Sequence, residues 1–214
     1  MNDHNIRSVT TKRQLEQALC KLLRDQSFNE ITVAQLLTTA HVSRGTFYRY
    51  YADKYELLAT YEDHLTGAIA SIFTSFMKPD VTQLTTKRSN DAFYAMLIYL
   101  YAHRQEVAVL IQCPASQLET KVRQLVLETV NIVPAESSTR HNLLPTIPSG
   151  LAQALVVDNI LTALTYWLTQ TPVLPPTLEY RIFVQTRALA PTELVNYIRP
   201  DLPVGGEQHG KTTV

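Results

Sequence analysis

The chain has 214 residues, and its 19 Lys and Arg residues are balanced by 19 Asp and Glu residues. This length allows one large or two small domains with a full hydrophobic core, and two fit the element pattern best. The zero net charge excludes any argument from bulk charge to a nucleic acid partner. Cys20 and Cys113 lack the spacing of a zinc site, which favours a reduced, cytoplasmic protein.

The N-terminal segment, residues 1–9, has no helical periodicity and is predicted to be a flexible arm. Thr11 and Gln14 have capping-box spacing, so a helix is expected to start there and to end near Gln26. Its apolar face is formed by Leu15, Ala18, Leu19, Leu22 and Leu23.

Three further helix starts follow within residues 32–58. Thr32 with Gln35 and Asp53 with Glu56 have capping-box spacing, and Ser43 can cap a helix alone. The pattern predicts a helix over 33–40, a tight connection at 41–42 and a second short helix over 44–51. This arrangement is a helix-turn-helix.

The second short helix has two distinct sides. Phe47 and Tyr51 lie four residues apart and are expected to pack inward against Ala34, Leu37 and Val42. Guanidinium and hydroxyl groups on the outer side suit the edges of guanine and the phosphates of a DNA major groove. Gly45 would let the backbone approach the duplex closely. The outward residues are Arg44, Thr46, Tyr48 and Arg49.

Over its first 60 residues the chain resembles the TetR family of bacterial transcriptional regulators. The residues that carry the resemblance are Phe28, Ile31-Thr32-Val33, Ala40-His41-Val42-Ser43, Gly45-Thr46-Phe47-Tyr48, Tyr51, Lys54 and Leu57-Leu58. Two positions depart from the usual pattern: His41 replaces a glycine that relieves a positive φ angle, and Tyr50-Tyr51 replaces a His-Phe pair. Histidine tolerates positive φ better than a β-branched residue does, so the turn is expected to survive with some strain.

The resemblance implies a three-helix DNA-binding head over residues 10–60, with Lys54 touching the DNA backbone at the start of a fourth helix. The alternative for Lys54 is a solvated charge, although a cation at a helix N-terminus opposes the helix dipole. The predicted contacts with double-stranded DNA are Thr32, Ser43, Arg44, Gly45, Thr46, Tyr48, Arg49, Tyr50 and Lys54.

The fold class expected for the whole chain is all-α. The fourth helix should run from Lys54 to about Met77 and join the head to a helical regulatory and dimerisation domain over residues 61–199. An irregular loop is expected over 133–149 and a disordered tail over 200–214. Further helices are predicted near 90–103, 106–112, 116–130, 151–170, 178–189 and 192–198.

A head of this size offers a small interface, so reading a palindromic operator requires a homodimer. The resemblance implies that the last long helices of two copies form a four-helix bundle. Candidates for that interface are Leu155, Leu164 and Trp167, with burial of Trp167 in its own core as an equal alternative.

The resemblance also implies a pocket in the second domain for a small apolar or aromatic effector that releases the repressor from DNA. Polar tips among apolar neighbours give the candidates, although tyrosines in a core are the default interpretation. These candidates are Tyr94, Tyr99, Tyr101, His103, Gln112 and Tyr166.

The sequence lacks the motifs of the main enzyme classes and of a membrane protein. No glycine-rich phosphate loop, GxSxG, HExxH or paired metal ligands occur, and the six histidines are scattered, so no enzyme, metal or cofactor is expected. A catalytic Asp158–His103 pair is the alternative that an enzyme would need. Residues 92–102 are too short to span a membrane and residues 151–168 carry polar interruptions. A helical co-activator or adaptor controlled by a partner protein stays open as the alternative regulator.

Overall fold

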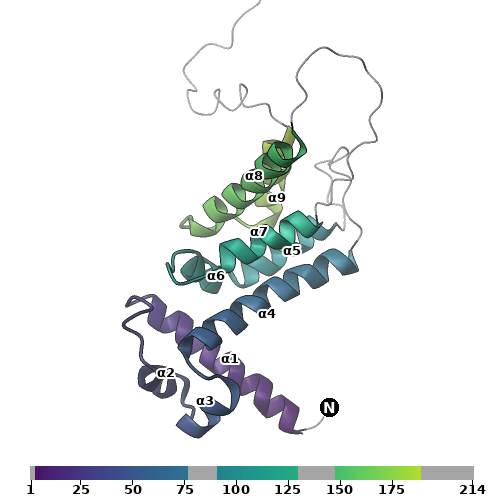
Figure 1. The fold of residues 1–214 in the computed structure, drawn as a ribbon. Coiled ribbons are helices and arrows are strands. Elements are labelled where there is room, and N and C mark those ends of the chain that lie inside the picture. The colour runs from purple at the N-terminus through teal and green to yellow at the C-terminus, as the bar shows by residue number, and fades with distance from the viewer. Residues whose placement is uncertain (1–2, 77–90, 130–147, 189–214) are drawn as a thin grey trace, which may run out of the picture.

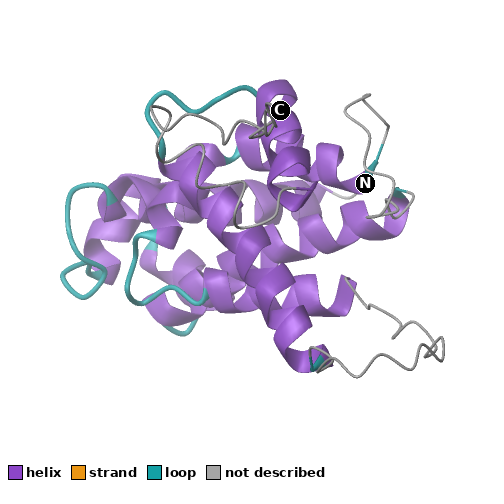
Figure 2. Cartoon of the chain, turned by 90° about the horizontal axis from the view of Figure 1, so that it is seen from above, coloured by secondary structure: helices purple, strands orange, loops and turns teal. Residues whose placement is uncertain are grey.

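The computed structural model describes residues 3–76, 91–129 and 148–188, and the regular structure in these ranges is entirely helical (Figure 1, Figure 2). The prediction of an all-α fold is therefore confirmed. The predicted helix 192–198 and tail 200–214, and nearly all of the predicted loop 133–149, lie outside the described residues. The helices are α1 (Asp3–Leu23), α2 (Val33–Ala40), α3 (Arg44–Tyr50), α4 (Lys54–Ser75), α5 (Ala92–Ala102), α6 (Arg104–Ile111), α7 (Leu118–Thr129), α8 (Ser149–Thr169) and α9 (Pro176–Ala188).

Helix α1 begins at Asp3, so the predicted flexible arm is wrong. Thr11 lies inside the helix, where its hydroxyl donates to the carbonyl oxygen of Arg7 at 2.9 Å and caps nothing. The predicted apolar face is confirmed, because Leu15 and Leu19 are fully buried. The polar first turns gave no periodic signal, which is why the sequence placed the start of the helix too late.

Helices α1, α2 and α3 and the start of α4 share one core. Phe28 and Ile31 are buried in the connection between α1 and α2, as predicted. Ala34 is exposed, contrary to expectation, and Leu36 takes its place in the core. These three helices form a compact head at one end of the molecule (Figure 1).

Helix α4 runs from the head into the body formed by α5 to α9 (Figure 1). It is joined to α7 by a buried carboxylate: Glu62 accepts hydrogen bonds from the hydroxyl of Ser116 and the backbone N–H of Gln117, both at 2.8 Å. Lys121 reaches back from α7 and donates to the carbonyl oxygen of Ala59 at 2.9 Å. The N-terminus of α7 is therefore held by a side chain of α4, because unpaired helix N–H groups attract an anion.

In the body, α5 packs between α4 and α9, and α8 contacts α6, α7 and α9. Asp91 caps α5 by accepting from the backbone N–H of Tyr94 at 2.8 Å, and it also accepts a hydrogen bond from the hydroxyl of Tyr180 on α9. Gly150–Thr169 in α8 is the one helical stretch of the described chain with the length and mean hydropathy, 1.3, of a membrane span. Only 33% of that stretch is buried in the single chain.

Candidate nucleic-acid interface

The helix-turn-helix is built as the local sequence predicts. Gln35 donates its backbone N–H to the Thr32 hydroxyl at 3.2 Å, and the Gln35 side chain accepts from the Thr32 backbone N–H at 2.8 Å. At α3, the Ser43 hydroxyl accepts from the backbone N–H of Thr46 at 3.2 Å. Both helix starts are thereby fixed by side chains within three residues, which makes the unit locally determined.

The turn between α2 and α3 is left-handed at His41, with φ 55° and ψ 41°. The predicted positive φ is confirmed. The backbone N–H of His41 donates to the carbonyl oxygens of Leu37 and Thr38 and so caps the end of α2. A non-glycine residue in this region costs on the order of 1 kcal/mol, which the capping bonds offset.

Helix α3 has a buried side and an exposed side. Phe47 and Tyr51 are 0% and 2% exposed, and their ring centroids lie 5.8 Å apart. Tyr48 is 51% exposed, and its ring meets Phe47 edge-on at 5.3 Å. Thr46 is half-buried. The remaining predicted DNA-contact residues of this unit that are exposed are Thr32, Ser43, Arg44, Gly45 and Arg49.

Gly45 lies in the first turn of α3. A Cβ atom built on it would meet no heavy atom within 4 Å, and its φ angle is not positive. Packing within the chain therefore gives no reason for glycine at this position, although glycine costs about 1 kcal/mol relative to alanine in a helix. A partner molecule that approaches the backbone at Gly45 would explain the glycine.

Tyr50 is held between α1 and α3. Its hydroxyl accepts from the Arg49 guanidinium at 3.1 Å, and its ring lies 5.6 Å from Lys12 Nζ. A hydrogen bond with the Ser8 hydroxyl is the main cause that lowers the pKa of Tyr50, and Arg49 adds to it. No pattern in the sequence indicates that Ser8 and Lys12 lie beside Tyr50 of α3, because these contacts are tertiary.

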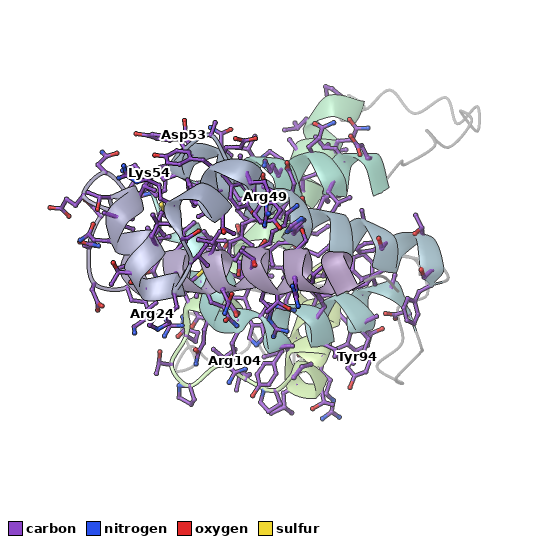
Figure 3. The ribbon with its side chains drawn as sticks, turned by 90° about the horizontal axis from the view of Figure 1, so that it is seen from below. Arg24, Arg49, Asp53, Lys54, Tyr94 and Arg104 are labelled. Atoms are coloured by element: carbon purple, nitrogen blue, oxygen red, sulfur yellow. The ribbon has the colours of Figure 1, made fainter. Side chains whose placement is uncertain are left out.

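Lys54 does not present a free ammonium group. Its Nζ atom donates to the carbonyl oxygens of Phe28, Asn29 and Ile31 at 2.8, 3.0 and 2.7 Å and lies 4.8 Å from the centroid of the Phe28 ring. An ammonium has three protons to donate, and all three have acceptors here. We therefore correct the prediction: Lys54 ties the chain before α2 to the chain after α3, next to the exposed Asp53 (Figure 3).

The six predicted effector contacts do not converge on one cavity. Tyr94 packs edge-on against Tyr180 at 5.5 Å, and Tyr101 stacks on Trp167 at 6.3 Å. Tyr166 is 68% exposed on α8. Tyr94 also lies far from the head residues Arg49 and Lys54 in Figure 3.

The other three predicted effector contacts, Tyr99, His103 and Gln112, line two clefts at the junction of head and body. Gln112 lines a cleft of about 290 Å³ beside the end of α1. Tyr99 and His103 line a larger cleft of about 660 Å³. The prediction of a shared effector pocket is therefore wrong for the set, because most of these side chains pair with other side chains or face solvent.

The body also encloses an apolar cavity among α4 to α8, which the sequence did not reveal. Its volume is about 40 Å³, far below the several hundred Å³ of typical ligand pockets. Its lining residues follow the same pattern as ordinary core residues, so no sequence signal separates them. The lining includes Ile69, Met96, Leu100, Val107, Ile111, Leu118, Val122, Leu161, Leu164 and Leu168.

Two of the three predicted dimer contacts are buried and one is exposed. Leu164 and Trp167 are 6% and 1% exposed, and Trp167 donates its indole N–H to the carbonyl oxygen of Leu174 at 2.8 Å. The predictions that Leu164 and Trp167 lie in a dimer interface are corrected, because both side chains are buried within the single chain. Leu155 is 58% exposed and remains available to a second copy.

Comparison with known proteins agrees with this geometry. Residues 17–61 match the family described as bacterial regulatory proteins, tetR family. An uncharacterized HTH-type transcriptional regulator of Bacillus subtilis (strain 168), YxbF, is 30% identical over 103 residues, which cover 48% of this chain and 27% of that protein. The crystal structure of a TetR transcriptional regulator from Streptococcus agalactiae 2603V superposes with a TM-score of 0.57 over 86% of this chain and 97% of that chain, at 18% identity. The matched segment runs from the end of α1 through α2 and α3 to the start of α4, and so contains the elements of the candidate interface.

Proposed function

Because its N-terminal domain places this chain in the TetR family of bacterial regulatory proteins, we propose that it is a homodimeric transcriptional repressor, not an enzyme. It binds a palindromic operator in the cytoplasm and leaves the DNA when a small effector binds. The aligned part of YxbF is about a quarter of that protein, so the function of the whole relative is not carried over.

The exposed polar side of α3 is the observation that carries the proposal. Arg44 and Arg49 supply guanidinium groups for guanine edges or phosphates, and Tyr48 supplies an exposed hydroxyl. The helix itself is rigid, because Ser43 caps its start and Phe47 anchors it in the head core. A short rigid helix with donors on one side is suited to a major groove.

Dimerisation is supported by the apolar surface of α8 and α9. The described residues include eleven exposed large hydrophobic side chains, and six of them lie on these two helices or on the connection between them. Single exposed apolar residues are ordinary, whereas a concentration on two adjacent helices favours an interface. The six are Leu151, Leu155, Tyr166, Leu174, Leu178 and Ile182.

Regulation by an effector is supported by the position of α4, which starts in the head and packs against α5 and α7 in the body. A ligand that prefers one arrangement of the body shifts the population of head positions by its differential affinity.

The test is selection of bound DNA from a random pool, followed by sedimentation of the complex. We expect a palindromic consensus bound by two copies. In a gel shift with the selected DNA, Tyr48→Ala should weaken binding by about 1–3 kcal/mol. The exposed Tyr55→Ala variant, on the first turn of α4, serves as control. A protein that stays monomeric and enriches no sequence contradicts the proposal.

A further inference from the structure

A cleft of about 660 Å³ lies where α1 of the head faces α4, α5 and α6. This volume falls within the range of ligand pockets, about 300–1,000 Å³. By comparison, the cleft beside Gln112 measures about 290 Å³ and the apolar cavity in the body only about 40 Å³. A molecule in the larger cleft would touch the head and the body together.

The body side of the cleft is aromatic. Tyr99 of α5 and His103, the residue that follows α5, have ring centroids 4.5 Å apart. Tyr61 of α4 contributes a third ring and is 6% exposed. Burial raises the pKa of both tyrosines, so their hydroxyls stay neutral. These rings offer flat surfaces on which a planar apolar group can stack.

The carboxylates and the cations of the cleft differ in their neighbours. Its two carboxylates have histidine neighbours: Glu16 lies 2.7 Å from Nδ1 of His64, and Glu106 lies 4.0 Å from Nδ1 of His103.

On the α1 side the cleft carries two cations, Lys12 and Arg13. Neither forms an ion pair with a carboxylate among the side chains described in residues 7–76, 91–129 and 148–188, and Lys12 only approaches the ring of Tyr50 at 5.6 Å. Lys12 and Arg13 are therefore two positive charges open to an anionic partner, and they line the same cleft as the rings of Tyr99 and His103. An anionic group is the complement of that charge.

We propose that this cleft binds aromatic carboxylates. The ring stacks on Tyr99 and His103, and the carboxylate pairs with Arg13 and Lys12. A guanidinium suits this task, because its planar fork can hold both carboxylate oxygens.

Such a ligand bridges α1 to α5, and α1 also packs against α2 of the helix-turn-helix. Occupancy therefore favours one position of the head relative to the body. This regulatory consequence rests on the proposed function, whereas the binding itself does not.

The binding test is calorimetric titration of the full chain with three matched probes: indole-3-acetate, its uncharged amide indole-3-acetamide, and the cation tryptamine. We expect the carboxylate to bind at least tenfold more tightly than the amide and the cation least tightly. Equal affinity for acid and amide, tighter binding of tryptamine, or no binding of indole-3-acetate overturns the proposal.

Variants locate the binding. Arg13→Gln and Lys12→Gln should each weaken indole-3-acetate at least fivefold with an unchanged Tm, while Lys21→Gln, an exposed residue at the other end of α1, leaves it unchanged. A carboxylate that binds the Arg13 variant as tightly as the wild type overturns the site. DNA selection on the ligand-free protein is independent of these titrations, so failure of the cleft and failure of the proposed function are distinguishable.

Discussion

The Nζ atom of Lys54 lies 2.7 Å from the carbonyl oxygen of Ile31, the residue just before the N-cap of α2. One side chain at the start of α4 therefore closes the helix-turn-helix into a loop, with its two ends joined by charge-assisted hydrogen bonds. The position of α3 relative to α2 depends on this closure as well as on the core. Lys54 therefore stabilises the helix-turn-helix by joining its two ends.

Lys54→Met keeps most of the aliphatic stem over Phe28 and removes the ammonium group. We expect the free energy of unfolding to fall by about 1–3 kcal/mol, because three carbonyl oxygens lose a charged donor. Denaturant unfolding measures this loss, with Lys21→Met as control.

The salt dependence of DNA binding distinguishes a phosphate contact by Lys54 from its role in closing the helix-turn-helix. The slope of log K against log salt should stay unchanged in Lys54→Met, whereas Arg44→Met should reduce it by about one. A slope reduced by one in the Lys54 variant would restore the phosphate contact and contradict the closure as its main role.

Gly45→Ala tests whether an external partner requires the glycine. The added methyl group meets empty space in the free chain, so stability should rise by about 0.5–1 kcal/mol. DNA affinity should fall at least about tenfold, ~1.4 kcal/mol, because the methyl group occupies space that the duplex needs. Gly67→Ala on α4 is the matched control: its Cβ position is also open, and it should stabilise the chain without changing DNA affinity. Unchanged DNA binding by Gly45→Ala would contradict a close approach of the duplex to the backbone at this position.

The helix-turn-helix was predictable because its determinants are local. Thr32 and Gln35 bind each other within one helical turn, and the positive φ of His41 followed from the resemblance to a family with glycine at that position. The partners of Lys54 lie 23 to 26 residues away in sequence and are backbone atoms, which carry no residue signal. Tyr94 looked like a ligand contact because its partner Tyr180 lies 86 positions further along the chain. Local chemistry is legible in a single sequence, whereas a choice among tertiary partners is not.

The hydroxyl of Tyr51 is buried and has no hydrogen-bond partner among the described residues. Burial raises the pKa of Tyr51 to about 12, so the hydroxyl is neutral at any ordinary pH. Tyr51→Phe removes an unpaired polar group and leaves the ring in place, so we expect stability to increase by about 1 kcal/mol. Thermal unfolding measures it, with the exposed Tyr48→Phe as a control that should not change stability. A clear loss of stability would mean that the hydroxyl has a partner after all.

Glu179 gives the chain a pH dependence of known sign. It is 3% exposed on α9, and burial raises its pKa from 4.5 to about 7. The folded state therefore holds a proton that the unfolded state releases between these two values, so the free energy of unfolding falls as the pH rises from about 4.5 to 7 and is level above that range.

Glu179→Gln removes the ionisation and keeps nearly the same shape. The variant should match the wild type near pH 4.5 and exceed it at pH 8 by up to about 3 kcal/mol, the value of the full shift in pKa. Urea unfolding at both pH values measures the difference. Glu128→Gln, on the exposed side of α7, should follow the wild type at both pH values. Parallel pH profiles for wild type and Glu179→Gln would show that the carboxyl group is ionised in the folded chain, which would require water or a cation within reach of its oxygens.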